Sequence, residues 1–170
     1  MNETIDILMA TYNGEKYLPE QIESILNQSY KNFNLIISDD CSQDGTRKIL
    51  KEYEKKDDRV KVIFQEHNLG YIKNFEFLLK QVKNDFFMLS DQDDFWLPEK
   101  VEKSYQILCK ENADMAFGDL EVVNQDLKTI YKSFNDFMLL SRKINKYINT
   151  YKINYLYNCV TGCTVICKKK

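Results

Sequence analysis

The sequence predicts an α/β fold in which an open, mostly parallel sheet is flanked by helices. Short apolar runs of strand length alternate with amphipathic segments of helix length along residues 5–117, and this alternation is typical of βαβ units. The 170 residues fit a single domain that can build its own core. Right-handed crossovers then restrict the sheet to a few doubly wound strand orders.

Five apolar runs predict the strands of this sheet. Each run is short and ends at turn residues, which is consistent with a buried strand. In chain order they are residues 5–10, 33–38, 60–64, 86–89 and 115–117. Further along, residues 121–123 and 128–131 flank a polar turn and predict a hairpin.

The segments between the strands predict helices, because their apolar residues repeat at intervals of three and four. Pro19 and Pro98 suit the first turns of the first and last of these helices, and Thr46 can cap the second. The third is the clearest, and its apolar face consists of Ile72, Phe75, Leu78, Leu79 and Val82.

Composition excludes several classes of protein. Apolar residues make up 44% of the chain and charged residues 29%, which excludes collagen and low-complexity disorder. No apolar run approaches the length of a membrane helix, and the N-terminus lacks signal-peptide features, so we expect a cytoplasmic protein. The five cysteines form no CxxC pair, and we expect core thiols rather than disulfides or a zinc site.

Charge divides the chain at residue 136. Residues 137–170 carry seven basic and no acidic residues, which leaves 17 basic and 26 acidic residues in 1–136. We therefore distinguish a core, 1–136, from a basic, tyrosine-rich C-terminal segment, 137–170. That segment could meet a membrane surface, a phosphate-bearing acceptor or nucleic acid, or could be a solvated face with tyrosines in a core.

Three polar clusters directly follow predicted strands. Ligands of open α/β sheets bind outside the carboxyl ends of the strands, where the strand order reverses. With the order 3-2-1-4, the reversal lies between strands one and four, and the clusters converge there. They are Thr11-Tyr12-Asn13, Asp39-Asp40 and Asp91-Gln92-Asp93-Asp94.

The aspartates of these clusters predict a divalent cation. Crowded carboxylates are unfavourable unless a cation or hydrogen-bond donors lie among them. Hard oxygen ligands suit Mg²⁺ or Mn²⁺ shared with substrate phosphates, with Asp93 as the first candidate ligand. The simpler interpretation, that these aspartates form turns and caps, is the one we favour for Asp44.

Other phosphate-binding and catalytic motifs are absent. The sequence contains neither a P-loop nor a GxGxxG motif, and no acidic pair follows the first strand as in a receiver domain. His67, the only histidine, falls in a predicted loop, which argues against Ser-His-Asp and Cys-His triads.

At three motifs the sequence resembles the family 2 glycosyltransferases, over about residues 4–120. The motifs are Ala10-Thr11-Tyr12-Asn13-Gly14, Ile37-Ser38-Asp39-Asp40-Cys41-Ser42-Gln43-Asp44-Gly45-Thr46 and Ser90-Asp91-Gln92-Asp93-Asp94-Phe95-Trp96-Leu97-Pro98. Asn68-Leu69-Gly70, Asn74-Phe75 and Thr161-Gly162-Cys163-Thr164 resemble the bacterial rhamnosyltransferase-like subgroup.

The resemblance implies a glycosyltransferase-A fold that binds a nucleotide-diphospho-sugar. On that model Thr11 and Tyr12 line the base and ribose site, Asp40 binds the nucleobase and Asp91 faces the ribose or sugar. Asp93, with Asp91, would hold Mn²⁺ or Mg²⁺, and Trp96 would pack beneath the acidic residues. The full set implied for the nucleotide-sugar is Ala10, Thr11, Tyr12, Asp39, Asp40, Lys73, Asn74, Asp91 and Gln92.

The implied reaction is inverting transfer of a sugar to a saccharide or lipid-linked acceptor of surface-polysaccharide synthesis. The family's carboxylate base would follow the Thr161-Gly162-Cys163 strand, beyond Lys170, and the last acidic residue is Asp136. Asp119 is a poor substitute by position. We therefore expect a C-terminally truncated chain that binds donor, and keep a non-catalytic nucleotide-sugar-binding module or partner subunit as the alternative.

Partners follow from the same reasoning. A nucleic-acid-binding function through the basic segment 137–170 is the least favoured interpretation, and we expect no nucleic-acid partner. The basic segment favours peripheral contact with the cytoplasmic face of the membrane, where a lipid-linked acceptor would lie. A truncated edge would expose apolar surface and favour self-association into a homo-oligomer.

Overall fold

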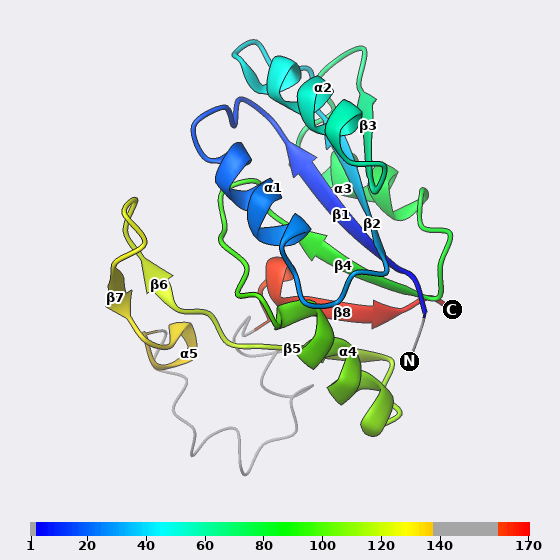
Figure 1. Ribbon diagram of the computed structural model, residues 1–170, viewed down its shortest axis with the longest axis vertical. Coiled ribbons are helices and arrows are strands. Elements are labelled where there is room, and N and C mark those ends of the chain that lie inside the picture. Colours follow the sequence, from blue (N-terminus) through cyan, green and yellow to red (C-terminus); the bar gives the residue numbers. More distant parts are fainter. Residues whose placement is uncertain (1–2, 138–159) are drawn as a thin grey trace.

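The computed structural model describes residues 3–137 and 160–170 and shows a six-stranded sheet flanked by helices (Figure 1). The strand order is β3-β2-β1-β4-β8-β5. The first four strands are parallel and β8 is antiparallel to both of its neighbours. The mostly parallel sheet and the order 3-2-1-4 are therefore confirmed, and the strand order reverses between β1 and β4.

The strands lie where the apolar runs predicted them. The main sheet contains β1 (Ile5–Thr11), β2 (Phe33–Asp39), β3 (Val60–Phe64), β4 (Phe86–Ser90), β5 (Met115–Phe117) and β8 (Val165–Lys168). The predicted hairpin is a separate two-stranded sheet of β6 (Val122–Val123) and β7 (Thr129–Tyr131). Before β8, a 3₁₀ turn at Gly162–Thr164 replaces the Thr161-Gly162-Cys163 strand that the family resemblance implied.

The helices also follow the predicted order. They are α1 (Leu18–Leu26), α2 (Thr46–Lys56), α3 (Tyr71–Leu79), α4 (Lys100–Lys110) and a short α5 (Phe134–Phe137). Thr46 is not the cap of α2, as the sequence suggested, but its first residue. Gly45 occupies the N-cap, and the Thr46 hydroxyl accepts a hydrogen bond from the Gly14 amide at 2.8 Å. The hydroxyl thus links the loops after β1 and β2.

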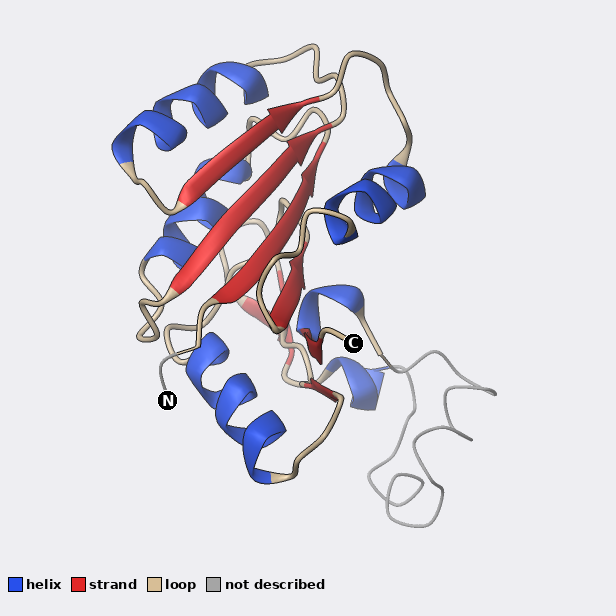
Figure 2. Ribbon diagram, turned by 90° about the vertical axis from the view of Figure 1, so that its right-hand side faces the viewer, coloured by secondary structure: helices blue, strands red, loops and turns tan. Residues whose placement is uncertain are grey.

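The two faces of the sheet are covered unequally (Figure 2). One face packs against α1, α2 and α4 in a large core that includes Ile22, Leu50 and Leu108. The opposite face packs against α3 through a small cluster of Leu8, Ile36, Leu78 and Val82. Val82 lies beyond the end of α3 but is buried, whereas Ile72 is 79% exposed and Leu79 is also exposed, so only part of the predicted apolar face of that helix is buried.

The described end of the basic segment belongs to the main sheet. β8 pairs with β4 through Met88–Ile166 and with β5 through Ala116–Ile166. Cys41, Cys109, Cys163 and Cys167 are free thiols, and Cys159 lies outside the described residues. Within 3–137 and 160–170, no helix is long and apolar enough to cross a membrane.

Candidate functional site

The loops that follow β1, β2 and β4 meet at the carboxyl edge of the sheet around a polar cleft of about 510 Å³. Of the ten residues predicted for the donor and metal site, eight line it. The lining consists of Ala10, Thr11, Tyr12, Asp40, Asn68, Gly70, Tyr71, Asn74, Asp91, Gln92 and Asp93. The reversal of strand order therefore brings together residues that are up to 83 positions apart in the chain.

The other two predicted residues are outside this lining. Asp39 is fully buried beneath the cleft, where its carboxylate accepts hydrogen bonds from Arg47 Nε at 2.7 Å and the Ser42 amide at 3.2 Å. Lys73 is exposed on α3 and does not line the cleft. Asp39 thus has a structural role, because its hydrogen bonds hold the loop that follows β2.

Both carboxylate oxygens of Asp40 accept hydrogen bonds from backbone amides. Oδ1 accepts from Leu69 N at 2.6 Å and Oδ2 from Gly70 N at 2.9 Å, and the residue is 3% exposed. Gly70 has a φ of 80°, a left-handed conformation that favours glycine. Asp40 therefore fixes the turn that leads into α3, in addition to presenting its side chain to the cleft.

Asn74 anchors α3 to β2. Its Oδ1 accepts from the Ser38 hydroxyl at 2.5 Å, and its Nδ2 donates to the Ser38 carbonyl at 3.1 Å. Both residues are buried. The first turn of α3 is thereby held against the sheet at the floor of the cleft.

Gln92 joins the loops after β1 and β4. Its Oε1 accepts from the Tyr12 amide at 2.9 Å, and its Nε2 donates to the Tyr12 carbonyl at 3.1 Å. A Cβ added to Gly14 would overlap the Gln92 amide. Glycine at this position lets the two loops approach closely enough to form this pair of hydrogen bonds.

The acidic loop, residues 91–97, has the strongest charge repulsion in the site. Burial, followed by the charges of Asp94 and Asp93, raises the pKa of Asp91 to about 6. The Oδ2 atom of Asp94 is buried and has no hydrogen-bond partner among the described residues. These carboxylates are therefore arranged so that a bound cation would stabilise them.

Cys163 lies beside the acidic loop. Ligand atoms of Asp91, Asp94 and Cys163 lie within 4.8 Å of one another, a spacing that could hold a metal ion. Burial, followed by the charge of Asp94, raises the pKa of the Cys163 thiol, so the thiol stays protonated near neutral pH. Asp93, the ligand predicted from the sequence, is instead exposed at the rim of the cleft.

Buried polar residues of α1 support the acidic loop. Ser24 Oγ accepts from the Trp96 amide at 3.0 Å, and Gln28 Nε2 donates to the Leu97 carbonyl at 2.8 Å. Trp96 itself is 2% exposed, so its expected place beneath the acidic residues is confirmed. Sequence reasoning missed this support, although Gln21, Ser24 and Gln28 share one helical face at intervals of three and four.

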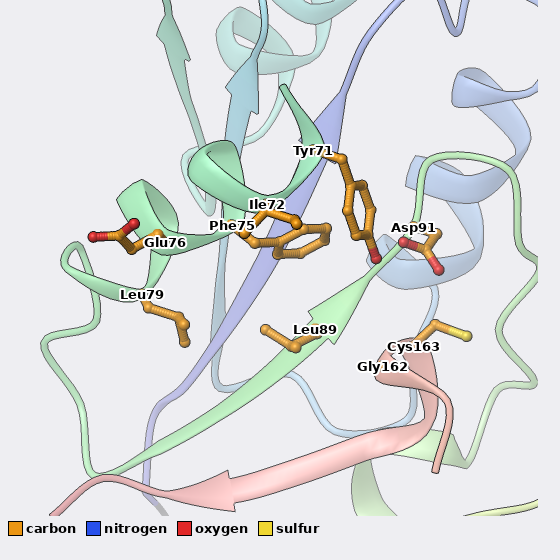
Figure 3. A pocket seen from close by; sticks show the side chains of 9 residues that line it. All are labelled: Tyr71, Ile72, Phe75, Glu76, Leu79, Leu89, Asp91, Gly162 and Cys163. Atoms are coloured by element: carbon orange, nitrogen blue, oxygen red, sulfur yellow. The ribbon is translucent and has the colours of Figure 1, made fainter. Parts of the chain in front are cut away.

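A second cavity, of about 390 Å³, adjoins the cleft (Figure 3). Its lining is mostly apolar and includes Phe75, Leu79 and Leu89. Tyr71 and Asp91 line both cavities, and Figure 3 shows the Tyr71 hydroxyl directed towards Asp91. The sequence predicted no such cavity, because it depends on the turn before β8 lying against α3.

Known proteins share this fold and part of this sequence. The UDP-Glc:alpha-D-GlcNAc-diphosphoundecaprenol beta-1,3-glucosyltransferase WfgD of Escherichia coli is 29% identical over 165 residues, which are 95% of this chain and 58% of WfgD. The S. aureus protein TarS, in a crystal structure with UDP, superposes with a TM-score of 0.66 at 29% identity over 72% of this chain and 37% of the TarS chain.

A more distant structure shows the fold alone. The mannosyltransferase PcManGT of Pyrobaculum calidifontis, solved with GDP-Man and Mn²⁺, has a TM-score of 0.73 at 14% identity over 99% of this chain and 45% of its own. The chain spans about half the length of the curated relatives it matches.

The family model for glycosyl transferase family 2 matches residues 6–170, almost the whole chain. This match confirms the family expected from the three motifs, and the solved structures confirm the nucleotide-sugar transferase fold. The chain belongs to glycosyl transferase family 2.

Proposed function

We propose that the cleft binds a nucleotide-diphospho-sugar and presents it for glycosyl transfer to the hydroxyl of a saccharide or lipid-linked acceptor. One observation carries the proposal. Polar residues from the ends of β1, β2 and β4, which include Thr11, Asp40 and Asp91, line a single cleft at the point where the strand order reverses. TarS and PcManGT, which share the fold, were solved with UDP and with GDP-Man and Mn²⁺.

The residues fit a divalent cation such as Mn²⁺ or Mg²⁺. The raised pKa of Asp91 and the unpartnered Oδ2 of Asp94 mark a site that favours positive charge. Asp91 and Asp93, which line the cleft, would hold the ion together with donor phosphates, and a ligand atom of Asp94 lies within 4.8 Å of one of Asp91. When bound, the cation would stabilise negative charge on the departing nucleoside diphosphate.

The chain's own residues would position the donor. Thr11 and Tyr12 form the wall beside β1, and Asn74 holds the start of α3 at the floor. Gln92 keeps the loop that carries Tyr12 at a fixed distance from the acidic loop. We infer that the donor bridges these two loops, with inversion at the anomeric carbon when an acceptor hydroxyl attacks from the opposite side.

Calorimetric titration tests the donor site. UDP, dTDP and GDP are each titrated with and without Mn²⁺, and we expect one of them to bind with metal. Asp93→Asn should weaken that binding by about 100-fold, because it removes a charged ligand of the cation. Asp126→Asn, at an exposed turn of the β6–β7 hairpin, is the matched control and should bind as the wild type does. Equal binding by Asp93→Asn would contradict the metal site.

Donor binding without transfer is the second candidate function. It is favoured by one observation on the carboxylates that line the cleft: Asp40 is held by two backbone amides, and Asp91 and Asp93 are assigned to the cation, which leaves none of the three to deprotonate the acceptor hydroxyl. Release of the nucleoside diphosphate from the bound donor distinguishes the candidates: turnover by the 170-residue chain supports transfer, whereas tight binding without turnover supports a binding module.

A further inference from the structure

Lys100, at the start of α4, is half-buried and places its ammonium group at the junction of three segments. Its Nζ donates a hydrogen bond to the Cys163 carbonyl at 2.5 Å, and it lies 3.9 Å from the centroid of the Trp96 ring. Lys100 is not among the residues that line the polar cleft or the apolar cavity. Its charge therefore acts inside the protein rather than directly on a ligand.

A buried lysine is costly unless its surroundings favour positive charge. Burial lowers the pKa of Lys100 to about 8, and the negative charges of Asp94 and Asp91 oppose that change. The face of Trp96 offers a further favourable contact, since the indole ring attracts a cation. The ammonium group is in contact with the two parts of the site that must stay together.

These two parts come from distant regions of the chain. Trp96 belongs to the acidic loop, and Cys163 belongs to the turn at Gly162–Thr164 that precedes β8. The Cys163 thiol lies within 4.8 Å of ligand atoms of Asp91 and Asp94. Without a cation between them, the carboxylates of Asp91 and Asp94 repel each other, which strains the acidic loop where it meets this turn.

We propose that Lys100 is a positioning residue that holds the acidic loop against the Gly162–Thr164 turn and acts as the internal counter-charge for Asp91 and Asp94. The proposal rests on the proposed function in one respect, that the acidic loop receives a divalent cation. Lys100 then keeps the carboxylates in place before the cation arrives. Its removal loosens the loop and weakens cation binding, even though a nearby positive charge is lost.

Trp96 makes the proposal measurable, because it is the only tryptophan in the chain. Acrylamide quenching of its fluorescence reports how often the acidic loop opens, and it requires no ligand. Lys100→Met, which keeps the length of the side chain but not its charge, should raise the quenching constant by about threefold through local opening. Lys100→Arg keeps the charge and should stay close to the wild type.

The matched control is Lys103→Met on the same helix. Lys103 is exposed and pairs only with Glu99 of the same segment, at 2.5 Å. Its removal should leave the quenching of Trp96 unchanged. If Lys100→Met does not fold, as judged by circular dichroism, Lys100→Gln takes its place, because it keeps an N–H donor for the Cys163 carbonyl but no charge.

Titration with Mn²⁺ alone, followed by Trp96 emission, completes the test. We expect Lys100→Met to bind Mn²⁺ about tenfold more weakly than the wild type. Unchanged quenching in Lys100→Met, or equal or tighter Mn²⁺ binding, would overturn the proposal; tighter binding would show that Lys100 competes with the cation. A wild type that ignores Mn²⁺ would contradict the proposed metal site instead, and acrylamide quenching would still decide the role of Lys100.

Discussion

Two pairs of aspartates lie at the same edge of the sheet in opposite environments. At the end of β2, the carboxylates of Asp39 and Asp40 accept hydrogen bonds from the Arg47 side chain and from the backbone amides of residues 42, 69 and 70. Asp91 and Asp94, after β4, face each other, and Asp94 Oδ2 has no partner among the described residues. The protein itself supplies the partners of the first pair of carboxylates, whereas the second pair is arranged to receive a bound cation.

The first pair of aspartates should therefore contribute to the stability of the fold, and the second pair to the binding of a cation. Removing a satisfied carboxylate leaves buried donors unpaired and should weaken the fold. Neutralising a carboxylate in a repelling group should strengthen the fold and abolish the attraction for a cation. The predictions below use this contrast.

The largest expected effect is at the first pair. Asp40→Ala leaves the amides of Leu69 and Gly70 without their acceptor and should lower the free energy of unfolding by about 3 kcal/mol, since each hydrogen bond to a charged group contributes roughly 1.5–3 kcal/mol. Urea denaturation measures the change. Asp58→Ala, at an exposed turn before β3, is the control and should change it by less than about 0.5 kcal/mol. A loss as small as the control's would show that the Asp40 bonds do not hold the turn.

The second pair should behave in the opposite way. Asp91→Asn removes a partly buried charge beside Asp94 and Asp93, and without metal at pH 7.5 it should raise the free energy of unfolding by about 2 kcal/mol. The gain must depend on pH. Because the pKa of Asp91 is raised to about 6 in the folded protein, the wild type loses this stability as pH rises from about 4 through 6.

Urea denaturation from pH 4.5 to pH 8 checks the sign. The difference in unfolding free energy between Asp91→Asn and the wild type should be small at the acid end and largest above pH 7. A difference that shrinks as pH rises would mean that Asp91 is stabilised by a partner and belongs with Asp39 and Asp40.

The smallest effect is expected where the two halves of the cleft meet. Gly14→Ala should displace the Gln92 amide from Tyr12 and cost about 1 kcal/mol, because two partly exposed neutral hydrogen bonds are lost. Gly118→Ala is a fitting control, since its added Cβ has no neighbour within 4 Å. If both variants unfold at the same urea concentration as the wild type, Gln92 does not connect the two loops in solution.

Much of the fold could be predicted from the spacing of apolar residues along the sequence. β3 spans residues 60–64 as its apolar run predicted, and Pro19 lies in the first turn of α1. Six of the eight site residues could be placed together because each polar cluster follows a strand and the strand order could be anticipated; the other two, Ala10 and Asn74, came from the family resemblance. Contacts between residues far apart in the chain could not be predicted from such local patterns. Nothing in the sequence indicated that the Lys100 ammonium contacts the Cys163 carbonyl, because the two residues are 63 positions apart.

The two aspartate pairs show the same limit. Asp40 and Asp91 look alike in the sequence, each an aspartate just beyond a buried strand. What separates them is the pair of hydrogen bonds that the Asp40 carboxylate accepts from the Leu69 and Gly70 amides. Local pattern therefore located the carboxylates, and tertiary hydrogen bonding decided which of them a ligand would need to satisfy.

The position of β8 has a consequence for how the protein is made. Among the strands of residues 3–137 and 160–170, β5 pairs with β8 alone, and β4 pairs with β1 on one side and with β8 on the other. During synthesis, β3, β2, β1 and β4 leave the ribosome long before residues 165–168. The nascent chain can thus form four parallel strands early, but it must protect the open edge of β4 until the last strand is released. That edge is where chaperone contact or strand exchange between unfinished chains would begin.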